Sequence, residues 1–382
     1  MKKTLILLSI GLVALASCDK QQKSAVVDLS NAPAWVADED VPVPVEFGGG
    51  LFTVATTKGT AITSDDFKTA QYDILAAKAD GTPMGGFEGG VFVTNQEHAI
   101  VGGADDGQMI LTVDFGGPRF YPYLSTGGNA FNFYGYGIDG THKTLSSNMV
   151  TGIAIGNNDI IWASASPSQD NLDALGVADG FNARYMRAAY KHSLEGENLN
   201  ETLYYSYLPK LNFAHITSQI QFLIRAEDEY AANSLSNGNV KVQSIAINGI
   251  PVQATLNVIN GALAGSANGN LAVEGIPAGG QLPLYVLSEA VPVAADCGEP
   301  VFILPTDSLN IEIVISMPEG APSTTETISL NNIVPLVGGE ATTFLAGKKY
   351  LMTIVFQSIE EIKVVTELAE WETVTVDDIL LE

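Results

Sequence analysis

The side chains best suited to covalent chemistry are two cysteines, and the first of them stands in a recognisable motif. Cys18 completes the run Leu15-Ala16-Ser17-Cys18, which has the form of a bacterial lipobox. In proteins with this motif, a diacylglyceryl group alkylates the thiol and the preceding signal is removed. The apolar run Leu5 to Ala16 follows two lysines and has the length of a secretory signal core, too short for a membrane span. The sequence therefore predicts a signal peptide over residues 1–17 and a lipid anchor on Cys18.

The second cysteine and one histidine are candidates that we interpret as structural. Cys297 is the only thiol left once Cys18 is acylated, so no internal disulfide can form, and no histidine lies near it in sequence to activate it. His215 has no Cys, Asp or second His within metal-ligand spacing. We expect Cys297 to be a small buried residue and His215 to be hydrogen-bonded across a seam between sheets. We expect neither a metal site nor a cofactor.

The motifs of common catalytic sites are missing from the sequence. It contains no Gly-x-Ser-x-Gly elbow, no His-Glu-x-x-His pair and no Gly-x-x-x-x-Gly-Lys phosphate loop. The glycine-rich run Gly85 to Gly90 lacks the lysine that a phosphate cradle needs. We therefore do not expect an enzyme. A hydrolase stays open as a third hypothesis, because the two carboxylates of a glycosidase can lie far apart in sequence.

The composition predicts a folded, strongly acidic protein. The chain has 382 residues, of which 46% are hydrophobic, enough for about two domains with cores of their own. Asp+Glu 43 against Lys+Arg 18 gives a formal net charge of -25. Because nucleic acid is itself a polyanion, it is not an expected partner.

The pattern of apolar residues predicts strands throughout the chain. In the stretch Leu211 to Ile224, the apolar residues Ile220, Phe222 and Ile224 alternate with the polar residues Gln219 and Gln221. This alternation is typical of a strand with one buried face. Clean alternation recurs from Leu309 to Met317. β-branched and aromatic residues favour further strands over Ile110 to Phe115, Phe131 to Tyr136 and Ile160 to Ala163. The aromatic residues could form a sugar-binding platform, but their alternation favours core packing.

Turn dipeptides separate these strands. Asp-Gly pairs mark turns in the first half and Asn-Gly pairs in the second, among them Asn248-Gly249, Asn260-Gly261 and Asn268-Gly269. The run Leu256 to Leu263 is a candidate hairpin with a type I′ turn at Asn260-Gly261. The sequence therefore predicts an all-β protein made of two domains.

The residues after the lipobox contain a candidate processing site. Asp19 to Val41 are polar and contain proline, which suggests a tether, and Val43 to Val54 read as a strand or a bent strand pair. The small polar residues Thr56 to Thr60 then have the composition of an exposed, protease-sensitive loop. The basic residue in this loop is Lys58.

Several short motifs, in order, resemble the fimbrillin family of Bacteroidetes surface lipoproteins. Phe213-Ala214-His215 runs into Ser218-Gln219-Ile220, Ala346-Gly347-Lys348-Lys349-Tyr350 leads into a late strand, and Ala369-Glu370-Trp371 precedes an extended tail. The resemblance implies two tandem transthyretin-like β-sandwich domains. It also implies proteolytic maturation at a Thr-Arg segment, where this chain has Lys58 followed by Gly59. This departure leaves either a protease that accepts lysine or no cleavage at this site.

With this resemblance, we divide the chain into five parts. These are the signal peptide (1–17), a lipidated tether with a removable N-terminal strand (18–58), an N-terminal sandwich (59–206), a C-terminal sandwich (207–368) and a C-terminal donor strand (369–382). Fimbrillins use the C-terminal strand as a donor to the neighbouring subunit, which implies this role for Trp371, Val374, Val376, Ile379, Leu380 and Leu381. The alternative is that the tail completes its own domain as an edge strand.

The sequence leads to one functional hypothesis and a competing one. The first is a structural pilus subunit that serves adhesion, assembled by strand exchange at the outer membrane and cell surface. Its expected partners are other pilus subunits, outer-membrane lipid through Cys18, a maturation protease and a receptor on a host or bacterial surface. The competing hypothesis is a monomeric, surface-tethered lipoprotein that binds glycan or host protein.

Overall fold

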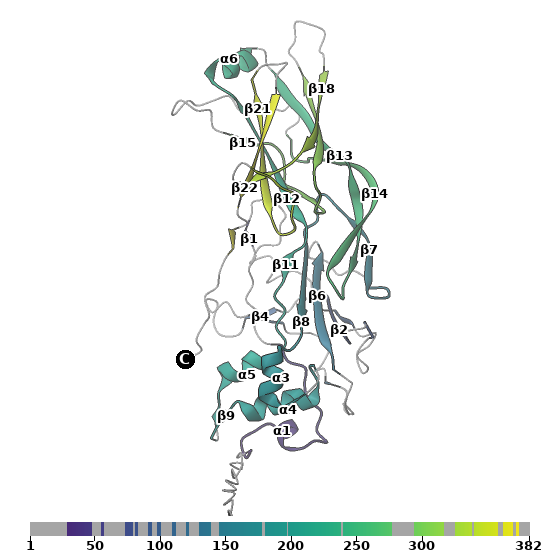
Figure 1. Ribbon diagram of the computed structural model, residues 1–382, viewed down its shortest axis with the longest axis vertical. Coiled ribbons are helices and arrows are strands. Elements are labelled where there is room, and N and C mark those ends of the chain that lie inside the picture. The colour runs from purple at the N-terminus through teal and green to yellow at the C-terminus, as the bar shows by residue number, and fades with distance from the viewer. Residues whose placement is uncertain are drawn as a thin grey trace, which may run out of the picture.

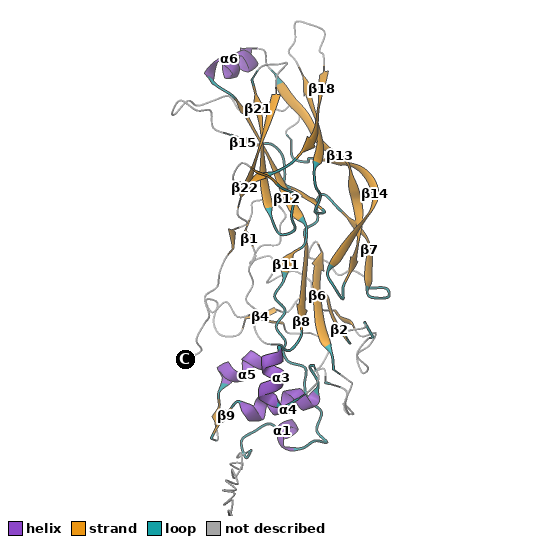
Figure 2. Cartoon of the chain, in the orientation of Figure 1, coloured by secondary structure: helices purple, strands orange, loops and turns teal. Residues whose placement is uncertain are grey.

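A computed structural model shows a protein built mostly from antiparallel strands, with a few short helices (Figures 1 and 2). This confirms the predicted all-β class. The structure describes residues 29–47, 55–56, 73–78, 81–82, 91–93, 98–100, 109–111, 120–121, 130–138, 145–177, 180–196, 198–237, 240–276, 294–316, 325–337, 340–357, 362–369 and 372–373. No helix among these residues combines the length and apolar character that crossing a membrane requires.

Three larger sheets contain most of the strands. The first sheet has the order β11 (Ala214–His215), β8 (Ile160–Ala165), β6 (Asn132–Ile138), β2 (Asp73–Ala77) and β3 (Val91–Val93). The second has β15 (Ala295–Asp296), β12 (Ser218–Ala226), β21 (Lys349–Phe356) and β22 (Ile362–Ala369), with β16 (Val301–Ile303) also pairing to β12. The third has β14 (Ala262–Ala272), β13 (Lys241–Asn257), β17 (Leu309–Ser316) and β18 (Thr325–Ile333), with β7 (Met149–Ala154) also pairing to β13.

The remaining elements are short. Two-stranded pairs join β1 (Ala55–Thr56) to β23 (Glu372–Thr373), β9 (Leu194–Glu195) to β10 (Asn198–Leu199), β4 (His98–Ile100) to β5 (Met109–Leu111) and β19 (Leu336–Val337) to β20 (Glu340–Ala341). The helices are α1 (Ala34–Ala37), α3 (Gln169–Leu175), α4 (Ala183–His192), α5 (Glu201–Tyr207) and α6 (Glu229–Asn237). Figure 1 shows α1, α3, α4 and α5 gathered at the end of the molecule opposite α6.

The first sheet is buried on both of its faces, and each face belongs to a different hydrophobic core. Leu75, Tyr134 and Ile160 join a large core with the side chains of the second and third sheets. Their chain neighbours Ile74, Phe133 and Ile161 join a second core, here called the helix-side core, with residues of α4 and α5. Because successive side chains of a strand point to opposite faces, one short strand can serve two cores.

Strand β12 departs from the predicted pattern in one respect. Ile220, Phe222 and Ile224 are buried as predicted. Gln219 and Gln221 are buried as well, and the side-chain amide of Gln221 donates to the carbonyl of Gly298 at 3.2 Å. The expectation of a single buried face was therefore wrong for the first half of β12, where side chains on both faces of the strand are buried. In β17 the predicted alternation is confirmed, with Leu309, Ile311, Ile313 and Ile315 all buried.

The Asn-Gly dipeptides play different roles from those predicted. Strands β13 and β14 form the predicted hairpin, with Leu256 opposite Leu263. Its loop is not a type I′ turn, because four residues separate the last pair, Asn257 and Ala262, and only Gly261 among them has a positive φ. Asn248-Gly249 lies inside β13, where the register shifts, and Asn268-Gly269 lies inside β14. These two pairs mark irregularities within strands instead of turns.

Helices α3, α4 and α5 were not predicted, although their signals are present in the sequence. Each begins with a side chain that caps the first turn, as Ser168, Asn182 and Asn200 accept hydrogen bonds from the backbone N–H three residues later. In α4 the buried residues Tyr185, Met186, Ala189 and Tyr190 follow the helical repeat. The expectation of a β-sandwich over residues 59–206 included no helices, but these caps and the helical repeat, with packing into the helix-side core, produce them.

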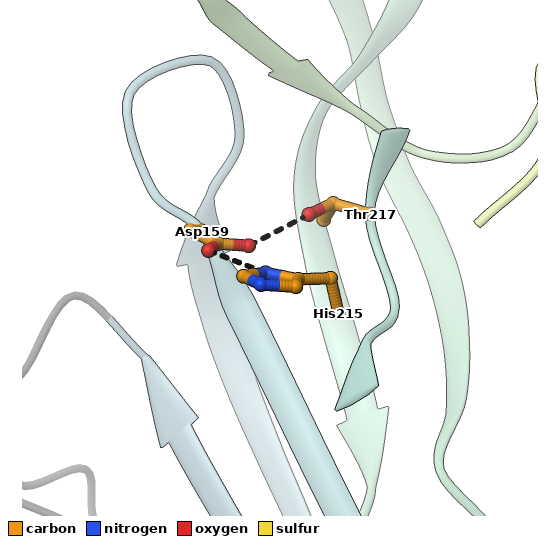
Figure 3. Close-up of polar contacts among 3 residues, drawn as sticks. All are labelled: Asp159, His215 and Thr217. Atoms are coloured by element: carbon orange, nitrogen blue, oxygen red, sulfur yellow. Dashed lines mark hydrogen bonds and ion pairs between the residues drawn. The ribbon is translucent and has the colours of Figure 1, made fainter. Parts of the chain in front are cut away.

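A buried carboxylate ties the first sheet to the second (Figure 3). Asp159 directly precedes β8, and its side chain contacts the Nδ1 atom of His215, at the end of β11, at 2.6 Å. Thr217 donates from its hydroxyl to the same carboxylate at 3.2 Å, and its own carbonyl accepts from the N–H of Gly347 at 2.8 Å. The three side chains are at most 7% exposed. His215 is thus paired as predicted, but its partner precedes a neighbouring strand of the same sheet and does not lie across a seam between sheets.

Two further contacts join the halves of the chain. Trp162 of β8 donates its indole N–H to the carbonyl of Val258 at 2.8 Å, and its ring fills the space beside Gly261, where a Cβ atom would come within 2.7 Å of the ring.

Cys297 is 5% exposed in the large core, and burial raises the pKa of its thiol to about 11. The thiol is therefore protonated at neutral pH, which fits the predicted role as a small buried residue.

Replacing Asp159 by asparagine tests the carboxylate contact. Asp159→Asn keeps the size of the side chain but removes the charge that faces His215. We expect the free energy of unfolding to fall by roughly 2–4 kcal/mol, since removing one partner of a buried pair is costly. Urea unfolding measures the loss. The exposed Asp307→Asn serves as a control that should change stability by less than about 0.5 kcal/mol. Equal, small losses in both variants would contradict the structural role of the contact.

Candidate functional site

The described part of the N-terminus, residues 29–47, packs into the helix-side core and is here called the N-terminal segment. Val36, Val43 and Phe47 are all buried and belong to the same core as Phe133 and Ile161 of the first sheet. Figure 1 shows α1 of this segment beside α4. The expectation of a tether from Asp19 to Val41 is therefore wrong for residues 29–41, because Val36 is buried in the helix-side core and α1 packs against α4.

Aromatic rings line the surface that the N-terminal segment covers. Phe47 meets Phe133 edge to face, with ring centroids 4.9 Å apart, and Trp35 meets Tyr190 of α4 at 5.5 Å. Tyr121 packs on the other side of Phe133 at 6.3 Å. Such pairs add to the free energy gained from burying apolar area. The aromatic residues of the first sheet are thus core residues, as the alternation in the sequence indicated.

One arginine of α4 holds the backbone of the N-terminal segment. Arg187 donates from Nε to the carbonyl of Trp35 at 2.8 Å, and from Nη2 to the carbonyls of Glu39 at 3.0 Å and Val41 at 2.8 Å. A guanidinium has five N–H donors in a fixed plane, so it can serve several carbonyls at once. The carbonyls near the end of α1 lack partners within the helix, which makes them good acceptors for a cation.

A carboxylate of the segment provides a second polar contact. The hydroxyl of Tyr204, in α5, donates to Glu46 at 2.9 Å. Burial, and then the neighbouring Glu46 carboxylate, raises the pKa of Tyr204 well above its usual range, so this phenol stays protonated and able to donate. The backbone N–H of Tyr121 also donates to the carbonyl of Val43 at 2.9 Å. The segment is thus held by both apolar and polar contacts.

A short antiparallel pair joins residues 55–56 to residues 372–373, at the C-terminal end of the described chain. Ala55 of β1 lies opposite Thr373 of β23, and Thr56 lies opposite Glu372. Strand β1 ends two residues before Lys58, and β23 begins directly after Trp371. The stretch before the predicted cleavage site is therefore the pairing partner of the first residues of the predicted donor tail.

The site residues predicted from the sequence lie outside the described residues. These are Cys18, Lys58, Gly59, Trp371, Val374, Val376, Ile379, Leu380 and Leu381. Sequence reasoning missed Arg187 and Phe47, which the structure places at the candidate site. A signal for Arg187 exists in its spacing from Arg184 and Lys191, at positions i, i+3 and i+7, in a chain with few cations. Within the described ranges, no three Asp, Glu, His or Cys side chains gather in a way that could hold a metal ion.

Solved structures of Bacteroidales proteins resemble this chain. A protein from Bacteroides uniformis, described provisionally as a cell adhesion protein, is 17% identical, with a TM-score of 0.48 over 87% of this chain and 100% of that chain. A protein of the same description from Bacteroides ovatus is 12% identical, with a TM-score of 0.42 over 87% and 98% of the two chains. None of the curated proteins compared with this chain matches it.

A family model gives the stronger result. The model described as fimbrillin-like matches residues 60–371, which is most of the 382-residue chain. This confirms the resemblance carried by the short motifs around His215, Gly347 and Trp371. The chain therefore belongs to the fimbrillin-like family.

Proposed function

We propose that this protein is a structural subunit of a cell-surface pilus that serves adhesion, and that it assembles by strand exchange after cleavage between Lys58 and Gly59. Membership of the fimbrillin-like family and the provisional adhesion role of the similar solved proteins support this proposal. The observation that carries it is the packing of the N-terminal segment. A stretch of chain that precedes the proposed cleavage site covers an apolar face of the first sheet.

Loss of the N-terminal segment would expose a surface that needs a new cover. Burial of Val36, Val43 and Phe47 contributes roughly 1.5–3 kcal/mol for each side chain, or roughly 5–9 kcal/mol together as an upper estimate. The uncovered aromatic rings, among them Phe133 and Tyr190, would then lie open in a groove. An extended peptide from a neighbouring subunit can fill such a groove and recover this free energy.

The pairing of β1 with β23 links cleavage to release of the tail. Cleavage after Lys58 separates β1 from the rest of the chain, because Thr56 lies on the N-terminal side of the cut. Glu372 and Thr373 then lose the partner that they have within their own chain. The tail from Trp371 onward, in which Val374 and Val376 occupy alternate positions, becomes available as a donor strand. One proteolytic event would thus create both the acceptor groove and the free donor.

A monomeric, surface-tethered binding protein is the second candidate. Its support is that the uncut chain already has complete cores, with the N-terminal segment held by Arg187 and Tyr204. Such a protein would keep its lipid anchor on Cys18 and its N-terminal segment permanently. The two candidates differ in the first residue of the mature protein, which is Gly59 for the pilus subunit and Cys18 for the tethered protein. This residue can be measured directly.

The lipid anchor is tested by Cys18→Ser. Only the thiol of the lipobox can form the thioether, so we expect the variant to remain an unlipidated precursor. Metabolic labelling with a palmitate analogue measures the modification, and Cys297→Ser is the matched control that should label like the wild type. Label on the Cys18→Ser protein would show that this assignment is wrong.

Cleavage is tested by Lys58→Ala. We expect mass spectrometry of wild-type surface protein to give an N-terminus at Gly59 and mild-detergent gels to show ladders of multimers. The variant should keep its N-terminal segment and run as a monomer, because the groove stays filled. Lys78→Ala, which removes a lysine outside the loop, should behave as the wild type. A wild-type surface protein that begins at Cys18 would favour the tethered binding protein instead.

The donor role is tested by deleting residues 372–382. If the tail is a donor, the shortened chain should unfold at nearly the wild-type urea concentration, because the deletion removes little beyond the short β23 pairing from its own fold. It should also form no ladders. An intrinsic edge strand predicts the opposite, a large loss of stability. Ladders formed by the deletion variant would exclude the donor role.

A further inference from the structure

Helix α4 carries an unusual concentration of positive charge. The chain has Lys+Arg 18 against Asp+Glu 43, yet α4 has Arg184, Arg187 and Lys191 on one side, since positions i, i+3 and i+7 of a helix lie within one face. We call these three residues the basic face of α4. Arg184 and Lys191 are exposed, and Arg187 is half-buried under the N-terminal segment.

The N-terminal segment meets this face through backbone carbonyls bound by Arg187. The carbonyls that Arg187 binds, those of Trp35, Glu39 and Val41, surround the run Asp38-Glu39-Asp40. The carboxylates of this run are exposed, while Val36 beside it is buried. The structure thus shows Arg187 of the basic face holding the backbone beside an acidic run whose carboxylates face solvent.

Removal of the N-terminal segment would leave Arg187 without these acceptors. The cover that half-buries Arg187 would leave with them, so its guanidinium would be free to bind a new acceptor, and hydrogen bonds to an ionised acceptor are the stronger ones. Carboxylates are the acceptors that match its geometry best. The proposed donor tail contains such groups in a similar setting, since Asp377 and Asp378 lie between Val376 and Ile379.

We propose that the basic face of α4 docks the acidic pair Asp377-Asp378 from the tail of a second copy of this chain. This inference rests on the proposed assembly by strand exchange, and it adds the element that would set the register of the donor. Apolar side chains of the tail alone could slide along the groove, whereas the acidic pair fixes which residue lies beside α4. The same face would first hold the N-terminal segment and later the incoming tail.

Two charge-reversal variants in cells test the inference. The donor variant is Asp377→Lys with Asp378→Lys, and the acceptor variant is Arg184→Glu with Lys191→Glu. The acceptor variant spares Arg187, so the hydrogen bonds that hold the N-terminal segment remain. Because like charges then face each other, we expect each variant alone to form ladders roughly tenfold less than the wild type at low salt. Lys210→Glu, an exposed reversal outside α4, should form ladders normally.

Coexpression of the two variants distinguishes docking between copies from docking within one copy. The lysines in the tail of the donor variant can pair with the glutamates on α4 of the acceptor variant. The acceptor variant keeps its native tail, which can pair with the native α4 of the donor variant. We expect the mixture to recover ladders that alternate between the two chains. Normal ladders from either variant alone, or no recovery in the mixture, would overturn the inference. An absence of ladders from the wild type would instead contradict the proposed function itself.

Discussion

The helix-side face of the first sheet must be covered, and much of the structure follows from this requirement. Ile74, Phe133 and Ile161 present an apolar surface on that face, while their chain neighbours already serve the large core. The cover therefore comes from α4 and α5, inserted between β8 and β11, and from the N-terminal segment. The hydrophobic effect requires that this apolar face be buried, but it does not determine which part of the chain buries it.

This divided cover explains how one end of the molecule can change while the other stays intact. The second and third sheets enclose the large core without residues of the N-terminal segment. The contacts of Asp159 with His215 and Thr217, and of Trp162 with Val258, connect the two ends through buried groups. A change in the cover of the helix-side core thus leaves the remaining sheets and their connection in place.

The sequence predicted strands well where one physical rule dominated. Alternation along Leu309 to Ser316 identified a strand correctly, and so did the parity of Ile220, Phe222 and Ile224. Prediction failed where two rules competed. The strand and turn signals of residues 59–206 led to an all-β expectation, although helix caps at Asn182 and Asn200 and the helical repeat of α4 were present. Asn248-Gly249 looked like a turn, but pairing on both sides of β13 continued the strand through it.

The sequence by itself determined the all-β class, the family and the short-range motifs, because these depend on residue type and spacing along the chain. Only the tertiary structure decided which distant groups meet: Asp159 with His215, Arg187 with the carbonyls of Trp35, Glu39 and Val41, and β1 with β23. A lone histidine or arginine has no local signature of its partner, since that partner lies tens to hundreds of residues away. The use of Val36, Val43 and Phe47 of the N-terminal segment as part of a core likewise depends on a sheet face that exists only after folding.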